Sequence, residues 1–152
     1  MTRLAVFTVV YNERGEVLLQ QRGPNSYLGG YWDFPSGHVE KAEDFRVAAV
    51  RELAEETNLI AEPESLKLVH IDHYSLKVDY INFVFTTHSW SGDPRILEAD
   101  KCSDIGWFKP NALPKKCVNV VRAFEQSGFT DELTYSVTDA QSYMTLMGEP
   151  LP

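Results

Sequence analysis

The sequence predicts an α+β fold with a mixed β-sheet. Segments rich in β-branched and aromatic residues recur along the chain, which is typical of strands. A long helical pattern at 43–57 and a shorter one at 118–126 are inserted between them without regular alternation. This order favours α+β over a parallel βαβ arrangement. The length of 152 residues fits one domain spanning 1–152.

The strands follow from composition and from the turn residues that separate them. A hairpin is expected first, because Asn12–Gly15 is a turn between two apolar runs. Residues 23–30 are predicted as a loop, and the next segment is expected to bend at Pro35–Gly37. The predicted extended segments are Arg3–Tyr11, Glu16–Arg22, Tyr31–Val39, Leu66–Leu76, Lys77–His88 and Ile105–Phe108, with a turn at Ser91–Pro94.

The helix predicted at Glu43–Thr57 is amphipathic. At about 100° per residue, one stripe collects four apolar residues and is expected to face the core: Val47, Val50, Leu53 and Ala54. Ala48 and Ala49 are expected on the open face, and Asn58 follows as a residue that tolerates the left-handed backbone of a helix end. Val118–Gln126 is the second predicted helix, and no structure is assigned after Ser127.

Composition excludes several classes of protein. The chain has 14 basic and 22 acidic residues and a net charge of −8, so a nucleic-acid polymer is a poor partner. No apolar run approaches the roughly 20 residues that span a bilayer, and neither a signal peptide nor a lipidation motif is recognised. Cys102 and Cys117 lack metal-binding spacing and are expected to be free thiols. The expectation is a cytoplasmic monomer or homodimer without a membrane partner.

Three carboxylates crowd one face of the first helix. Glu52, Glu55 and Glu56 lie within about 100° of one another on the helical wheel. Like charges about 6 Å apart cost on the order of 3 kcal/mol per pair at an effective dielectric near 20. A divalent cation such as Mg²⁺ would convert this repulsion into attraction. An acidic helix by itself is more often a solvated surface.

The surrounding pattern carries more information than the helix. Gly37 is followed at fixed spacing by Glu43, by Arg51-Glu52, by Glu55-Glu56 and by the aliphatic Leu59. This pattern over residues 37–59 closely resembles the Nudix box. Asn58 stands where the box has a glycine, and Ser36 and Ala42 replace two other glycines that are common nearby.

The resemblance implies an α/β/α sandwich and a loop–helix–loop that holds one to three Mg²⁺ or Mn²⁺ ions around a diphosphate. It implies that Glu52, Glu55 and Glu56 bind metal, with the backbone carbonyl of Ser36 as a further ligand. Glu52 is also a candidate general base, and Arg51 is expected to pair with Glu43 and brace the helix. The remaining candidates are Arg22, which would contact substrate phosphate, Glu98, as a loop metal ligand or base, and His38, as a neighbour of the phosphates.

The site for a nucleobase is left open by the residues. Strand aromatics could stack on a base, although alternating aromatics in strands more often form the core; the candidates are Tyr74, Tyr80, Phe83 and Phe85. Asn119 could hydrogen-bond a base edge, but solvation on the surface of the second helix is the favoured interpretation.

The resemblance implies a Mg²⁺-dependent hydrolase that cleaves a diphosphate linkage in a small nucleotide-type substrate. By elimination among subfamily markers, the expected reaction converts a (deoxy)nucleoside triphosphate to a monophosphate and pyrophosphate. The alternatives are a dinucleoside polyphosphate or nucleotide-sugar hydrolase, and a Nudix module that senses a nucleotide without cutting it.

Overall fold

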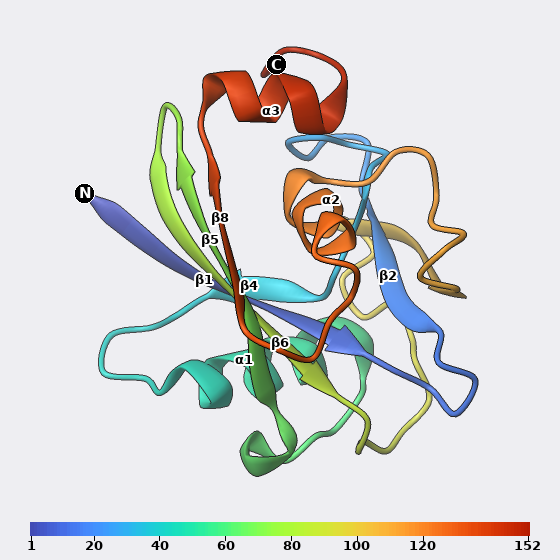
Figure 1. The fold of residues 1–152 in the computed structure, drawn as a ribbon. Coiled ribbons are helices and arrows are strands. Elements are labelled where there is room, and N and C mark those ends of the chain that lie inside the picture. The colour runs from blue at the N-terminus through green and yellow to red at the C-terminus, as the bar shows by residue number, and fades with distance from the viewer.

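The computed structural model describes all residues, 1–152. Its elements, shown in Figure 1, are β1 (Thr2–Val10), β2 (Val17–Arg22), β3 (Trp32–Asp33), β4 (Ser36–His38), α1 (Phe45–Thr57), a short 3-10 helix (Pro63–Ser65), β5 (Lys67–Ser75), β6 (Asp79–Thr87), β7 (Cys102–Phe108), α2 (Asn119–Gln126), β8 (Thr134–Thr138) and α3 (Ala140–Met147). The predicted α+β class is confirmed.

The strands form two sheets. A five-stranded sheet has the order β4-β1-β6-β5-β8, and a three-stranded sheet has the order β3-β2-β7. The larger sheet is mixed, because β1 runs parallel to β6 and β5 parallel to β8, whereas β4 and β5 run antiparallel to their neighbours β1 and β6. The mixed sheet expected from the sequence is therefore present.

The predicted hairpin pairing between the first two strands is wrong. β1 and β2 belong to different sheets and are bridged only at Tyr11 and Val17. The physical reason is that both edges of β1 are occupied, by β4 and β6, while β2 pairs with β3 and β7. The two strands diverge beyond the turn (Figure 1).

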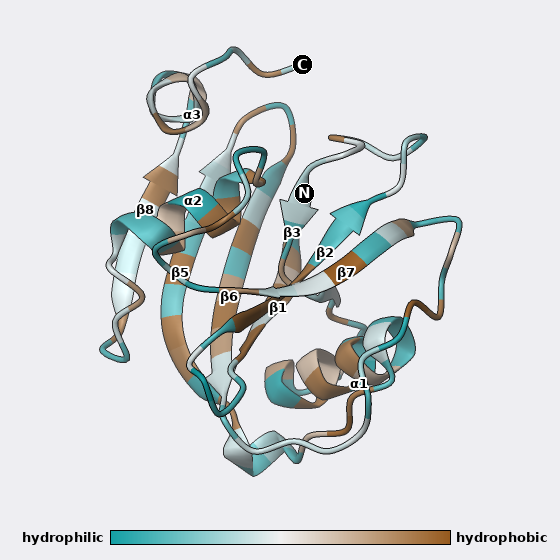
Figure 2. Ribbon diagram, turned by 90° about the vertical axis from the view of Figure 1, so that its right-hand side faces the viewer, coloured by the Kyte–Doolittle hydropathy of each residue, from teal (hydrophilic) through white to brown (hydrophobic).

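Two apolar clusters on opposite sides of the central strands hold the layers together. On one side α2 packs Val120, Val121 and Phe124 against β1 and β2. On the other side α1 packs Ala48, Ala49 and Leu53 against the same two strands and Phe85 of β6. Figure 2 shows the central strands between α1 below and α2 above. This arrangement confirms the expected α/β/α sandwich.

The orientation of α1 corrects the predicted helical stripe. Leu53 is buried as expected, but Val47 is 43% exposed, and Ala48 and Ala49, expected on the open face, are fully buried. The small alanines let the helix approach the sheets closely, which larger side chains would prevent. Glu52, one turn after Ala48, consequently lies against the sheets rather than on the solvent side.

Both ends of the α1 region have distinctive backbone geometry. The Asp44 side chain caps the helix by accepting hydrogen bonds from the amides of Arg46 and Val47. At the other end Asn58 has φ of 70°, and its N–H donates to the carbonyl of Ala54, which confirms the expected left-handed helix end. Ala42 also takes a left-handed conformation, with φ of 61°. Two of the positions where the sequence lacks the box's usual glycine thus have glycine-like backbones.

The segment after Ser127, unassigned from the sequence, forms β8 and α3. Thr134–Thr138 extends the large sheet as the parallel neighbour of β5. Asp139 and Ser142 form a capping box at the start of α3, whose Tyr143 is buried. Cys102 and Cys117 are free, as expected, and both are buried. None of the helices combines the length and the apolar character that crossing a bilayer requires.

Candidate active site

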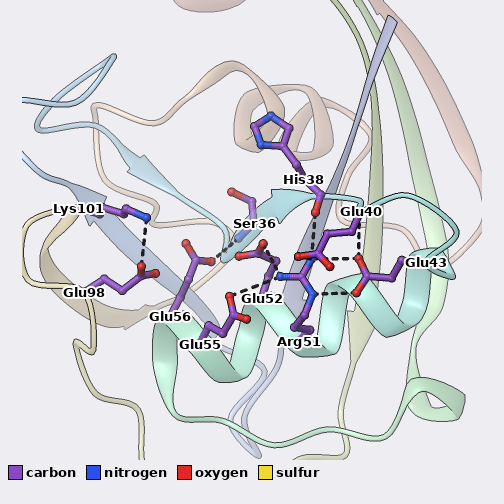
Figure 3. A network of polar contacts seen from close by, with 10 residues as sticks. All are labelled: Ser36, His38, Glu40, Glu43, Arg51, Glu52, Glu55, Glu56, Glu98 and Lys101. Carbon is purple, nitrogen blue, oxygen red and sulfur yellow. Dashed lines mark hydrogen bonds and ion pairs between the residues drawn. The ribbon is translucent and has the colours of Figure 1, made fainter.

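A short antiparallel pairing places the loop before α1 against the helix. Ser36, Gly37 and His38 form β4, which pairs with residues 5–7 of β1. This fixes the backbone of the loop directly beside the acidic turn of α1 (Figure 3). At Gly37 a β-carbon would overlap the carboxylate of Glu52. A side chain at residue 37 would therefore have to displace the Glu52 carboxylate, whereas the φ of Gly37 is one that other residues adopt.

Glu56 is held by the loop and partly withdrawn from water. The backbone N–H of Ser36 donates a hydrogen bond of 2.8 Å to Oε1 of Glu56 (Figure 3). Burial raises the pKa of Glu56 to about 8, and the negative charges of Glu52, Asp33 and Glu98 act in the same direction. A carboxylate in this position favours a bound cation, because a cation would offset the cost of burying the negative charge and the repulsion from the neighbouring acids.

Glu52 lies one turn before Glu56. Its side chain is 19% exposed, and its Oε1 accepts a hydrogen bond of 2.9 Å from Nη1 of Arg51. Burial raises the pKa of Glu52, while the Arg51 charge opposes the shift. Glu52 and Glu56 are therefore both poised to accept a proton or a cation.

Arg51 braces the loop that precedes α1 against the helix. Its Nε donates to Oε2 of Glu43 at 2.7 Å, and its Nη2 donates to Oε1 of Glu43 at 3.0 Å. Nη2 also donates to the backbone carbonyl of His38 at 3.1 Å. The guanidinium ties the loop to the helix (Figure 3), and the expected Arg51–Glu43 pair is present.

These elements surround a polar cleft of about 470 Å³. Six residues singled out from the sequence line it, namely Arg22, Ser36, His38, Glu52, Glu56 and Glu98. Glu55 is not among the lining residues: its side chain is 55% exposed and lies 3.4 Å from Nη1 of Arg51. Glu98 lines the cleft from a loop and pairs with Lys101 at 3.1 Å. The structure thus gathers the proposed site except for Glu55 and the bracing Arg51.

The donor set fits a divalent cation in an open site. No three His, Cys, Asp or Glu side chains are already arranged to hold a metal ion. Glu52, Glu56 and Glu98 nevertheless line one cleft, and the raised pKa of Glu56 marks an uncompensated carboxylate. Mg²⁺ commonly takes only one or two protein carboxylates and completes its shell with water and substrate phosphate. Carboxylates that line an open cleft can supply these protein ligands and leave room for water and substrate.

A second cavity of about 230 Å³ adjoins the cleft. Five residues line both, namely Arg22, Asp33, Ser36, Gly37 and His38. Tyr74 and Tyr80 line the second cavity, and the Tyr80 hydroxyl lies 3.1 Å from Nε2 of His38. Phe83 and Phe85 instead pack on the α1 side of the sheet. Among the four candidate aromatics, only the two tyrosines lie at the site.

Asn119 corrects a sequence-based interpretation. The sequence favours a solvated position for Asn119 on the helix surface, whereas the residue is buried and lines the second cavity. It is the first residue of α2, and the start of that helix faces the cavity.

Asp33, Asn82 and Lys101 were not identified from the sequence. Asn82 could have been found, because strand alternation places it on the same face of β6 as Tyr80. Asp33 carries no comparable local signal, because it reaches the site through the pairing of β3 with β2.

Comparison with known proteins agrees with this geometry. The NUDIX domain model matches residues 1–126. The 8-oxo-dGDP phosphatase NUDT18 of Mus musculus is 32% identical over 114 residues, which is 72% of this chain and 33% of that protein. The CTP pyrophosphohydrolase of Escherichia coli K12 is 39% identical over 61 residues, which is 40% of this chain and 45% of that protein. The matches cover only a third to less than half of these relatives' lengths.

Among solved structures, a MutT NUDIX hydrolase from Burkholderia pseudomallei superposes with a TM-score of 0.77 at 25% identity, over 83% of this chain and 97% of that one. A MutT protein from Bacillus halodurans, at 18% identity, shares the fold with a TM-score of 0.76, over 99% of this chain and 95% of that one. On the sequence match over residues 1–126 and the shared architecture, the chain belongs to the NUDIX domain family.

Proposed function

We propose that this protein is a divalent-cation-dependent hydrolase that converts a nucleoside triphosphate, with ribose or deoxyribose, to the monophosphate and pyrophosphate. One observation carries the proposal: a polar cleft lined by carboxylates shares five lining residues with a smaller cavity lined by aromatic and amide side chains. The first suits phosphates with a cation, and the second suits a nucleobase. Two of the relatives described above, a CTP pyrophosphohydrolase and an 8-oxo-dGDP phosphatase, support a nucleotide substrate.

The residues divide the work of binding. Glu52 and Glu56 would hold the cation, with the carbonyl of Ser36 and the carboxylate of Glu98 as further oxygen ligands. Glu55 would serve as an outer acidic group, because it lies outside the cleft. Arg22 and Lys101 carry the positive charges that line the cleft and would bind phosphate oxygens. His38, at the junction of the two cavities, would contact the phosphates nearest the sugar.

A bound Mg²⁺ or Mn²⁺ would neutralise charge on the anhydride oxygens and make a nearby water more acidic. The water oxygen bonds to phosphorus as the bond from that phosphorus to the bridging oxygen breaks, and pyrophosphate leaves. Glu52 would take the proton of the water, because burial has raised its proton affinity and Arg51 fixes its position. The acid that is protonated in this step returns its proton to solvent.

The size of the base cavity favours a mononucleotide over the alternatives. Its volume of about 230 Å³ suits one heterocyclic ring system. A dinucleoside polyphosphate or a nucleotide sugar would place its second half outside the two cavities. The alternative from a different class is a Nudix module that senses a nucleotide without cutting it. The charged residues of the cleft favour the hydrolase over this sensor.

The test is a substrate screen with pyrophosphate and phosphate readouts, with and without Mg²⁺. Release of pyrophosphate from triphosphates supports the proposal. Cleavage of dinucleotides or nucleotide sugars alone would replace it with the first alternative, and tight binding without turnover would replace it with the sensor. Glu56→Gln should lower kcat by at least about 100-fold, whereas Glu64→Gln, at an exposed position outside the cleft, should leave kcat unchanged.

A further inference from the structure

The chain continues beyond the matched family domain and returns to the region of the two cavities. The NUDIX domain model ends at residue 126, whereas β8, α3 and a short tail follow it. α3 ends at Gly148, whose φ of 74° turns the chain out of the helix. The tail of residues 149–152 then lies beside the loop that follows β2 (Figure 1), and the two segments line a common hollow of about 440 Å³.

One hydrogen bond joins the tail to this loop. The Tyr31 hydroxyl donates to Oε1 of Glu149. This bond raises the pKa of the Tyr31 hydroxyl, which is therefore a donor at neutral pH. Pro150 disfavours helical backbone at Glu149 and so reduces the conformational freedom of that residue. Nζ of Lys116 lies 5.8 Å from the centre of the Tyr31 ring, so a second segment also holds this side chain.

Tyr143 anchors the extension near the same loop. It is the first named of the large side chains that are fully buried, and it belongs to α3. Burial raises the pKa of the Tyr143 hydroxyl, and the nearby Tyr27 and Tyr31 act in the same direction. The loop therefore has α3 as well as the tail as a neighbour.

The same loop holds the side chain of Arg22. The backbone carbonyl of Tyr27 accepts a hydrogen bond of 2.6 Å from Nε of Arg22. The backbone N–H of Arg22 donates to the carbonyl of Tyr31 at 2.8 Å. Leu28 has φ of 54°, an unfavourable conformation for a non-glycine residue that its surroundings must maintain. A displaced loop would therefore move the Arg22 guanidinium, which lines the acidic cleft.

We propose that Glu149 and Tyr31 are positioning residues: they fix the loop of residues 23–31 and thereby hold the Arg22 guanidinium where it binds substrate phosphate. Neither residue lines the acidic cleft or the smaller cavity, so both act through Arg22 and not on the substrate. The inference rests on the proposed function only in taking Arg22 as a phosphate ligand.

Hydrogen exchange tests the fixing of the loop without any substrate. In Glu149→Ala the amides of residues 23–31 should exchange about 10-fold faster, while those of β1 keep the wild-type rate. Glu149→Gln retains an oxygen that can accept from Tyr31 and should restore most of the protection. Glu132→Ala, at an exposed position in the same extension, should exchange like the wild type. Wild-type exchange of the loop in Glu149→Ala would overturn the proposal.

Kinetics test whether the loop acts through Arg22. Glu149→Ala and Tyr31→Phe should each raise KM for a nucleoside triphosphate by roughly 5- to 10-fold and leave kcat within about 2-fold, because binding is weakened in the ground state and the transition state alike. The double variant should resemble the single ones. In an Arg22→Ala background, Glu149→Ala should not raise KM further. A full additional increase in that background would contradict the route through Arg22.

Binding of inorganic pyrophosphate with Mg²⁺ separates this inference from the hydrolase proposal. Calorimetry should show weaker pyrophosphate binding in Glu149→Ala than in the wild type and in Glu132→Ala. This loss of affinity, in a protein that turns over no nucleotide, would sink the hydrolase alone. Turnover with wild-type KM and wild-type pyrophosphate affinity in Glu149→Ala would sink the positioning role alone.

Discussion

The backbone N–H of Ser36 and Oε1 of Glu56 are joined by a hydrogen bond of 2.8 Å across 20 residues of sequence. This hydrogen bond orients the Glu56 carboxylate toward the cleft. Its donor belongs to β4 and its acceptor to α1, so both partners lie on regular elements. The pKa of Glu56 is nevertheless raised, because its carboxylate is buried and lies near other acidic side chains. The position of Glu56 therefore favours a bound cation, which would neutralise its charge.

The raised pKa of Glu56 predicts that the stability of the metal-free protein depends on pH. The pKa of Glu56 is raised from 4.5 to about 8, so the folded state holds its proton more tightly than the unfolded state does. Stability contributed by the protonated form is then lost as pH rises from about 5 to about 8, on the order of 2 kcal/mol after screening. Urea unfolding in EDTA measures this loss, and Glu56→Gln should flatten the slope. An identical slope in Glu56→Gln and in the wild type would contradict the assigned origin.

Gly37 is predicted to be intolerant of alanine because of Glu52, not because of its backbone. A β-carbon at residue 37 would displace the Glu52 carboxylate, so kcat/KM should fall by roughly 10-fold or more. The matched experiment is a double-mutant cycle on the free energy of unfolding. Gly37→Ala should be destabilising in the wild type and close to neutral in a Glu52→Ala background. Equal costs in both backgrounds would show that the two residues do not interact.

Arg51→Lys should weaken the brace although the charge is kept. Lysine cannot reproduce the two-point contact with Glu43 together with the bond to the carbonyl of His38. The expected cost is about 1–2 kcal/mol, or a Tm lower by roughly 2–8 °C for a domain of this size. Arg46→Lys, at an exposed position on the same helix, is the control. A Tm for Arg51→Lys that matches this control would rule out the bracing role.

Ala42→Gly should stabilise the protein. Ala42 has φ of 61°, where a β-carbon costs about 1–2 kcal/mol, and the larger unfolded-state entropy of glycine offsets part of that gain. The expected net change is roughly 0.5–1 kcal/mol, measurable by urea unfolding. Asn58→Gly is the informative contrast, because Asn58 also donates from its side chain to the carbonyl of Asp93. It should stabilise less than Ala42→Gly, and a lower stability for Ala42→Gly would contradict the reasoning.

The sequence predicted those features that depend on local spacing. The end of α1 at Thr57, the left-handed residue Asn58 and the Arg51–Glu43 pair all follow from residues within about two helical turns, whereas the start of α1 lies at Phe45, two residues after the predicted Glu43. The family pattern supplied the acidic site, and the structure places Glu52 and Glu56 at one cleft. These relationships need no knowledge of the sheets.

Features set by contacts between distant segments could not be predicted. The wheel alone could not tell which side of α1 the sheets would cover, and the burial of Ala48 and Ala49 decided it. Asp33 and Asn82 meet at one cavity because β3 pairs with β2 while β6 pairs with β1, in separate sheets. The exposed Glu55 shows the same limit, since a shared helical face did not bring it into the cleft.

The central claim is that the Glu52–Glu56 cleft captures a divalent cation, and titration with Mn²⁺ followed by electron paramagnetic resonance tests it most directly. The wild type should bind Mn²⁺, Glu56→Gln should weaken that binding by about 10-fold or more, and Glu64→Gln should bind like the wild type. Mn²⁺ binding of equal strength in the wild type and in Glu56→Gln would contradict the claim.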